Sequence, residues 1–235
     1  MDGTTRNRIS RRAACQSLAA GVSLLFTGGC INVAAIAGKM FIGDPKSNSK
    51  VKDISGVDLE EAGHRVILTC QAPLSVMEGY ESAASDLEVE LLRRMRQKKI
   101  PTVDSDEVVE LLDARGGQYN PQILIDEIPD ADLLFELRME SFTLKDLNTP
   151  QMYHGQCAGR IIGFQIIGGE EHGKAPGSRM MSQFFENDFD IDYPNGYPIP
   201  RENMSEMIFR KKFIGFLGQR LGNIFFDVTS QELYS

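Results

Sequence analysis

This sequence has few of the residues that form most metal and redox sites. Its 235 residues include four cysteines and three histidines, His64, His154 and His172. The cysteines show no C-x-x-C spacing and the histidines no H-x-x-x-H spacing, so the patterns of zinc and thioredoxin-like sites are absent. No G-x-S-x-G or phosphate-loop pattern occurs either. We therefore predict no enzyme activity, no metal and no cofactor.

Basic residues are also in deficit. The chain has 25 lysines and arginines against 33 aspartates and glutamates, a net charge of −8. Residues 1–29 hold four arginines and one aspartate, a net +3, which leaves about −11 on the rest of the chain. Nucleic acid is excluded as a partner, because its phosphates require clustered lysine and arginine. So acidic a domain is also repelled by anionic lipid, and any membrane attachment needs another device.

The amino terminus has the pattern of an export signal that ends in a lipidation site. Four arginines within residues 1–12 precede an apolar run over residues 13–26. This run has the length of a signal-peptide core and is too short to span a bilayer. The following Thr27-Gly28-Gly29-Cys30 resembles a bacterial lipobox, although Thr27 replaces the usual leucine, valine or isoleucine. We predict a signal peptide over residues 1–29 and a lipid on Cys30.

Two features of this leader leave alternatives open. Arg11 and Arg12 follow Ser10 as in a twin-arginine export signal, so both this route and the general secretory route remain open. Residues 31–42 are also apolar, so an uncleaved signal anchor that runs to Ala37 is the main rival to lipidation. A lipoprotein carries two or more acyl chains, which suffice for stable anchoring.

The remaining sequence predicts one folded domain. Residues 30–56 form the lipidated amino terminus and a flexible tether, because residues 43–56 are polar and contain Pro, Gly and Ser. Over residues 57–235, hydrophobic periodicity predicts strands at 66–70, 100–103, 133–144, 153–167 and 180–189, and helices at 81–99, 104–112, 121–127 and 204–227. The predicted fold class is α/β: a compact two-layer domain whose mixed sheet contains a three-strand antiparallel meander, with helices packed on one face.

Glycines recur with regular spacing in the second strand of the meander and in the last helix. Gly155, Gly159 and Gly163 share one face of the strand, and residues 215, 218 and 222 are glycines at helical spacing. Small residues on both elements predict an unusually close approach of this helix to this strand. The alternative is that these glycines are independent of one another.

Three aspartates near the end of the meander alternate as in a calcium loop. Asp188, Asp190 and Asp192 have this spacing, but Tyr193 and Ile199 occupy the positions where the loop requires glycine and glutamate. On a strand the three carboxylates share one face, so we expect a solvated acidic edge. A weak cation site is the alternative.

Two cysteines would remain in the folded domain. Cys70 and Cys157 lie inside predicted strands, where small buried thiols are common. A disulfide between them is an alternative in an oxidising envelope compartment. A hydrolase that uses one of these cysteines, or the Asp188–Asp192 segment, is the enzymatic alternative.

The order of motifs resembles a group of bacterial envelope lipoproteins. After the lipobox come VILTC at residues 66–70, LEVELLRRMRQKKIPTV at 87–103 and ADLLFELRMESFTL at 131–144, followed by Tyr153-His154-Gly155 and the helix end LGNIFF at 221–226. Over residues 57–228 this order resembles the superfamily of the curli-secretion lipoprotein, the LpoB-type activators of penicillin-binding proteins and the TolB N-terminal domain. The resemblance implies a compact α/β domain that binds proteins in the periplasm and has no active site.

The predicted function follows from the leader, the acidic domain and this resemblance. We expect a membrane-anchored lipoprotein that faces the periplasm, on either the outer or the inner membrane. It would be a non-enzymatic accessory module of an envelope assembly or transport complex and bind an envelope protein there. The alternatives are the envelope hydrolase and a purely structural tether, and self-association as a homo-oligomer stays open.

Overall fold

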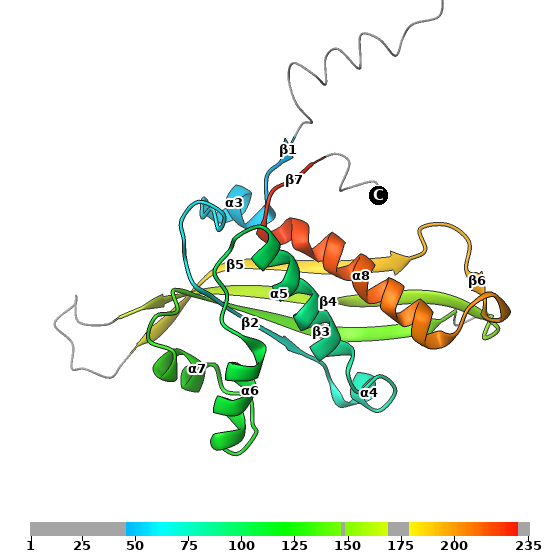
Figure 1. The fold of residues 1–235 in the computed structure, drawn as a ribbon, viewed down its shortest axis with the longest axis horizontal. Helices are drawn as coiled ribbons and strands as arrows, with labels where there is room; N and C mark the ends of the chain where they lie inside the picture. Colours follow the sequence, from blue (N-terminus) through cyan, green and yellow to red (C-terminus); the bar gives the residue numbers. More distant parts are fainter. Residues whose placement is uncertain (1–45, 147–148, 169–178, 230–235) are drawn as a thin grey trace, which may run out of the picture. The chain divides into compact units, whose positions relative to one another are not determined.

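A mixed β-sheet lies at the centre of the fold (Figure 1). The computed structural model describes residues 46–146, 149–168 and 179–229. In chain order the elements are β1 (Lys46–Ser47), α3 (Lys50–Ser55), β2 (Val66–Gln71), α4 (Leu74–Met77), α5 (Ala83–Gln97), α6 (Ser105–Ala114), α7 (Pro121–Glu127), β3 (Leu133–Lys145), β4 (Met152–Ile167), β5 (Met180–Tyr193), β6 (Ile199–Pro200), a 3-10 turn (Arg201–Asn203), α8 (Glu206–Phe225) and β7 (Val228–Thr229). The strand order is β2-β3-β4-β5, with β2 parallel to β3, the other pairs antiparallel, and β6 paired with the start of β4.

The predicted fold class is confirmed, and so is the meander of β3, β4 and β5. One predicted strand is wrong: residues 100–103 make only a single bridge, between Thr102 and Val66. The N–H of Val66 donates to the carbonyl of Pro101, and the N–H of Val103 donates to the carbonyl of Val66. Because Asp104 caps α6 directly after Val103, the chain turns into a helix before the ladder can continue along β2.

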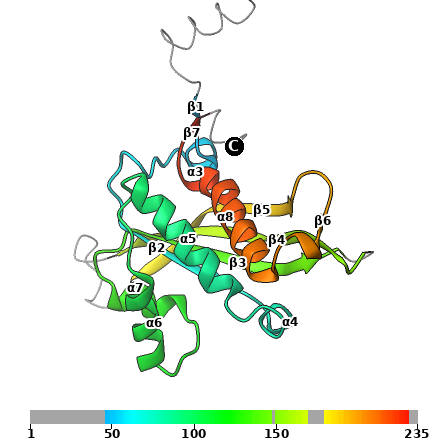
Figure 2. The same cartoon turned by 45° about the vertical axis from the view of Figure 1, so that its right-hand side comes forward.

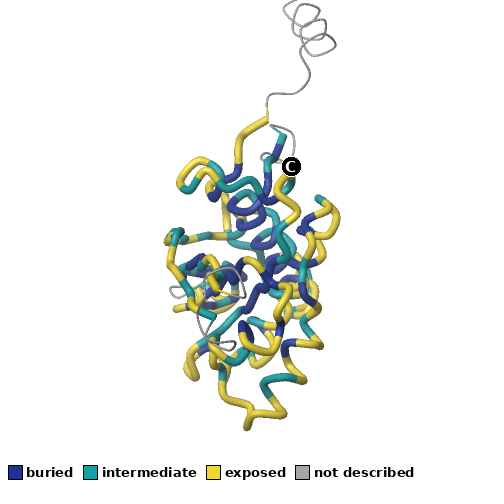
Figure 3. Tube along the Cα trace, turned by 90° about the vertical axis from the view of Figure 1, so that its left-hand side faces the viewer, coloured by how far each residue is buried: buried dark blue, intermediate teal, exposed yellow. Residues whose placement is uncertain are grey.

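Helices α5 and α8 lie together across one face of the sheet (Figure 2). Alternate strand residues point to this face and form the larger core with the two helices. Its largest fully buried side chains include Phe135, Phe185, Phe209, Phe213 and Phe225. Figure 3 shows the buried residues in the interior of the folded part and the exposed residues on its outside. The prediction that helices pack on one face of the sheet holds for α5 and α8.

Helices α6 and α7 cover the opposite face at one end of the sheet. Ile67 and Leu134 point there, because each follows a residue that points to the larger core. They form a second, smaller core with Val108 of α6 and with Leu124 and Ile125 of α7. At this end the fold therefore has helices on both sides of the sheet, which the two-layer prediction did not include.

The glycines of β4 make room for aromatic rings. A Cβ atom on Gly155 would lie 2.7 Å from ring atoms of Phe213 in α8, and one on Gly163 would lie 2.7 Å from the ring of Phe135. The close approach of α8 to this strand is therefore confirmed on the strand side. On the helix side the prediction is wrong, because Gly218 faces α5 and a Cβ there would lie 2.5 Å from Cγ of Glu90.

The folded part begins before residue 57. Ser49 caps α3, Val51 is fully buried, and β1 pairs with β7 near the carboxyl end of the described chain. The backbone N–H of Ser49 also donates to Oδ1 of Asp227, 2.9 Å away. The predicted tether of residues 30–56 is thus too long at its carboxyl end. The segment is polar overall, but it contains a helix cap, Ser49, and one valine, Val51, that is buried in the core.

Candidate functional site

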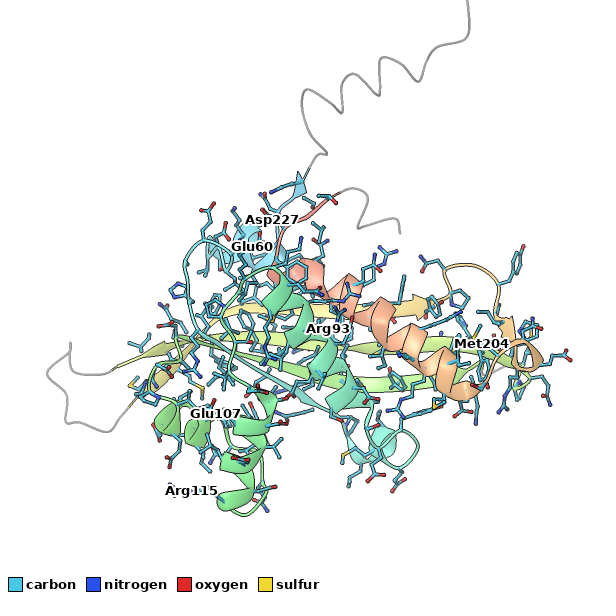
Figure 4. The ribbon with its side chains drawn as sticks, in the orientation of Figure 1. Glu60, Arg93, Glu107, Arg115, Met204 and Asp227 are labelled. Carbon is cyan, nitrogen blue, oxygen red and sulfur yellow. The ribbon has the colours of Figure 1, made fainter. Side chains whose placement is uncertain are left out.

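A surface groove of about 570 Å³ runs between α5 and α8. Figure 4 shows the two helices side by side and labels Arg93 on α5 and Met204 just before α8. The groove is lined by Asp86, Val89, Glu90, Met207, Arg210, Lys211, Ile214 and Gly215. Val89 is 55% exposed and Met207 is 78% exposed, although both are large apolar side chains. A partner that filled this concavity would bury these side chains, which makes the groove the candidate binding surface.

Glycines and one arginine determine how closely α5 and α8 pack together. Glu90 lies over Gly218, which has no side chain to push it away. Nη2 of Arg94 donates to the carbonyl of Gly215 across the helix pair, at 3.1 Å. The relative position of α5 and α8 at the floor of the groove is therefore set by contacts within the domain.

Charged side chains form the rim of the groove. Arg210 donates to Asp86 at 2.6 Å, which joins α8 to α5. Glu90 accepts from both Arg93 and Arg94 at 2.7 Å. Burial alone would raise the pKa of Glu90, but these two hydrogen bonds outweigh it and hold the pKa below its ordinary value.

The rim carries an excess of positive charge on an acidic domain. Four bases, Arg93, Arg94, Arg210 and Lys211, line or flank the groove together with two acids, Asp86 and Glu90. Both acids are already paired with arginines, whereas Lys211 makes no ion pair within the described residues. An apolar floor with a basic rim fits an amphipathic helix that carries acidic residues beside its apolar stripe.

The two remaining cysteines are free thiols in the covered face of the sheet. Cys157 is buried and Cys70 is half-buried, so the predicted disulfide alternative is not formed. Burial raises the pKa of Cys157 to about 12, and burial followed by the charge of Glu88 raises the pKa of Cys70 well above its ordinary value. Neutral thiols in such surroundings are poor nucleophiles.

A half-buried carboxylate closes the outer edge of β2. Oε2 of Glu88 accepts from the backbone N–H of Cys70 at 2.8 Å, which occupies a donor at the sheet edge. Burial raises the pKa of Glu88 to about 6. No feature of the sequence around Glu88 indicates this contact, because the two residues meet only when α5 packs beside β2.

The histidines within the described residues lie beside aspartates. Nδ1 of His64 is 3.7 Å from Asp132, and Nδ1 of His154 is 3.8 Å from Asp146. The charged neighbours of the thiols are instead carboxylates, Glu88 for Cys70 and Asp190 for Cys157. Within the described residues, the charged groups that act on the two thiols are therefore carboxylates, and the ion pairs of His64 and His154 are with aspartates.

The three aspartates of β5 share one face, as predicted. Asp188, Asp190 and Asp192 are exposed, while the residues between them are partly buried. Arg160 of β4 lies 2.7 Å from Asp188 and 2.7 Å from Glu186. In the described parts of the chain, no cluster of His, Cys, Asp or Glu is arranged to hold a metal ion.

One acidic residue of β3 has a different environment from the one its pattern predicts. Glu136, Arg138 and Glu140 alternate along β3, a pattern typical of a solvated strand face. Glu136 is in fact only 1% exposed. It accepts from the hydroxyl of Tyr119 at 2.7 Å and from Arg138, so its charge is satisfied inside the domain.

The predicted lipidation site and export residues lie outside the described residues. Cys30, Arg11, Arg12 and His172 all fall there. Among residues 46–146, 149–168 and 179–229, no helix is long and apolar enough to span a bilayer.

Comparisons with known proteins give only distant likenesses. No family of known proteins matches the chain, and no curated protein matches it. A hypothetical protein of Chlamydia trachomatis is 13% identical with a TM-score of 0.39, over 68% of this chain and 91% of its own. A dodecameric PelC variant of Paraburkholderia phytofirmans is 8% identical with a TM-score of 0.37, over 77% and 96%. The lipoprotein GNA1162 of Neisseria meningitidis is 9% identical with a TM-score of 0.35, over 68% and 99%.

Proposed function

We propose that this chain is a non-enzymatic protein-binding module of the bacterial envelope, anchored by a lipid on Cys30 and accessory to an envelope complex. The groove between α5 and α8 carries this proposal. Its exposed Val89 and Met207 would be stabilised by burial against a partner, and its basic rim stands out on an acidic domain. The partner would present an amphipathic helix with acidic flanks to this groove.

The environment of the thiols supports a binding role over the hydrolase alternative. A cysteine nucleophile works as the thiolate and needs a basic or cationic neighbour. Here burial raises the pKa of both thiols, and the carboxylates of Glu88 and Asp190 oppose thiolate formation further. The anchoring part of the proposal depends on the lipobox-like sequence before Cys30 and on the net negative charge of the remainder.

Site-specific crosslinking in cells tests the groove. Met207 would be replaced by a photo-crosslinking amino acid, with Tyr197, which is 94% exposed and outside the groove, as the reference position. We expect a discrete adduct from position 207 alone. An adduct of twice the chain mass would identify a second copy as the occupant and point to a homo-oligomer.

A matched pair of variants shows whether the adduct depends on the groove. Val89→Asp places a charge on the apolar floor, whereas Val109→Asp changes a valine of nearly equal exposure on α6. We expect V89D to lower the yield of the position-207 adduct about tenfold, as for a central interface residue, and V109D to leave it unchanged. Equal yields from both variants, or equal adducts from positions 207 and 197, would contradict the groove.

The anchor is tested by the intact mass of protein extracted from membranes. We expect a chain that begins at Cys30 and carries diacylglyceryl and acyl groups, and a Cys30→Ser variant that lacks them. A chain that retains Met1 would refute lipidation and support the uncleaved anchor, while leaving the groove proposal untouched.

A further inference from the structure

The sheet has one open edge in the described structure, and it is β5. The opposite edge strand, β2, is occupied by the bridge to Thr102 and by the side chain of Glu88. The only strand that pairs with β5 is β4, within the described residues. An uncovered strand edge presents a row of unpaired backbone groups, which proteins usually block or use.

The register shows which backbone groups of β5 point outward. The N–H of Ile166 donates to the carbonyl of Asp132, so the even-numbered residues of β4 bond toward β3 and the odd-numbered ones toward β5. Because Gly159 pairs with Phe189 and Cys157 with Ile191, the odd-numbered residues of β5 bond toward β4. The backbone groups of Asp188, Asp190 and Asp192 therefore face the open edge.

The side-chain bonds at this edge agree with that assignment. The carbonyl of Asp188 accepts from the side chain of Asn187 at 2.8 Å. When the side-chain amide of Asn195 is turned to satisfy both of its polar atoms, its nitrogen donates to the carbonyl of Asp192 at 3.2 Å. The backbone of Asp190, between them, has no such bond within the described residues and is the centre of the open stretch.

A groove of about 360 Å³ lies between this edge and α8. Phe189 and Ile191 of β5 line one side, and the largely buried Leu221 and Ile224 of α8 line the other. The bases Lys50 and Arg220 also line this groove. Oδ1 of Asn223 also lines the groove and is a buried acceptor without a donor in the described residues. An edge strand beside a helix, with both apolar and polar side chains in the groove walls and a spare acceptor, is the geometry in which an extended peptide adds to a sheet.

The negative charges of β5 favour a positively charged peptide at this edge. The outer face of the strand carries Asp188, Asp190 and Asp192, and only Asp188 has a basic partner, Arg160, within the described residues. A second copy of β5 paired antiparallel would place acids opposite acids, which disfavours it. A strand with basic residues at alternate positions would place them beside the aspartates and turn its other residues toward α8.

We infer that the edge of β5 binds an extended polypeptide segment in which basic and apolar residues alternate, as an added strand of the sheet. The backbone of Asp190 supplies the central pair of hydrogen bonds. The basic side chains lie on the outer face with the aspartates, and the apolar side chains enter the groove beside Leu221 and Ile224. This surface is separate from the groove between α5 and α8 and does not rest on the function proposed for that groove.

Binding of synthetic peptides to the full chain in detergent tests this inference. The probe is a labelled Val-Lys-Val-Lys-Val-Lys-Val peptide. Two controls are the same peptide with glutamate for lysine and a peptide of equal composition with its lysines in one block. We expect saturable binding of the alternating basic peptide and at least tenfold weaker binding of both controls. If the block peptide bound equally well, peptide charge alone would explain the binding, and the inference of an added strand would be overturned.

A pair of variants at one position separates the backbone from the charge. Asp190→Pro removes both the outward N–H and the charge, whereas Asp190→Asn removes only the charge. We expect D190P to weaken peptide binding about tenfold and D190N about two- to threefold. Equal effects of the two variants would refute strand addition. V89D in the other groove should leave peptide binding unchanged, so the two proposals can fail independently.

Amide hydrogen exchange on the unmodified chain tests the same inference without a variant, and so applies even if D190P fails to fold. Without peptide, the amides of Asp188, Asp190 and Asp192 should exchange quickly, while those of Phe189 and Ile191 are protected by β4. Adding the alternating peptide should slow the three aspartate amides. Unchanged exchange at saturating peptide would show that the peptide binds elsewhere and would overturn the inference.

Discussion

The two faces of strand β4 differ in what their residues do. On the covered face, Gly155, Gly159 and Gly163 give space to aromatic rings and to the neighbouring backbone. On the opposite face, Gln156 and Arg160 are partly exposed, and Arg160 bridges two carboxylates of β5. Neighbouring residues of one strand thus serve different purposes: the covered face holds the fold together, whereas the opposite face carries partly exposed polar side chains along Gln156–Arg160, away from the smaller core. We call this stretch of the opposite face the open face.

The largest effect is expected where the covered face is tightest. In Gly159→Ala the new Cβ would lie 2.3 Å from the carbonyl oxygen of Arg138 and 2.8 Å from the ring of Phe189. Because the first of these is backbone, β3 and β4 must shift, and we expect a loss of about 3 kcal/mol in the free energy of unfolding. Ala158→Val on the opposite face is the matched control, and urea denaturation should place it within about 0.5 kcal/mol of the wild type.

If both variants lose the same stability, the contrast between the two faces of β4 is wrong. A loss confined to A158V would mean that the open face is covered in the folded protein, and that a partner or a further segment occupies it.

A smaller effect is expected at the closed edge of β2, and it depends on pH. Burial raises the pKa of Glu88 from 4.5 to about 6, so the folded state binds this proton more tightly than the unfolded state. The contribution of Glu88 to stability is then greatest below pH 4.5 and falls by about 2 kcal/mol as the pH rises to 6 and above.

The Glu88→Gln variant measures this contribution, because glutamine keeps an acceptor for the N–H of Cys70 but does not titrate. Relative to the wild type, E88Q should gain about 2 kcal/mol between pH 4 and pH 7. Denaturation curves at both pH values give the difference. A constant offset between the two proteins would show that Glu88 is solvated in the folded state.

The smallest effect is expected on the open face. Arg160→Gln removes both ion pairs of Arg160, which lie at partly exposed positions and are screened by solvent. We expect the thermal unfolding midpoint to match that of the wild type, with the same dependence on salt. A clear loss of stability would mean that the open face contributes to folding and would weaken the contrast with the covered face.

Much of the fold could be predicted from local patterns. The alternation of Leu133, Phe135, Leu137 and Met139 predicted β3 and its buried face, and the spacing of Leu87, Leu91 and Met95 predicted α5. These predictions succeeded because strand and helix periods are visible within one element. The strand at 100–103 failed because its pairing depends on β2, more than thirty residues earlier, and ends where α6 begins.

The candidate sites were harder to predict. Val89 and Met207 stand off the buried stripes of their helices, a signal that the sequence contains, but nothing in it shows that the two residues line one groove. The acids of β5 were predicted to share a face, yet their position at the only open edge of the described sheet follows from strand order. The Tyr119–Glu136 bond has no local pattern, because a loop residue reaches a strand face.

By itself, the sequence determined the α/β class, most element positions, the acidic charge and the lipobox-like site at Cys30. Periodicity, composition and short motifs act over a few residues and can be read without the fold. Only the tertiary structure decided that α5 and α8 enclose a groove, that Glu88 closes the edge of β2 and that the edge of β5 stays open. These features depend on which elements are neighbours in space, and such contacts join residues far apart in the chain.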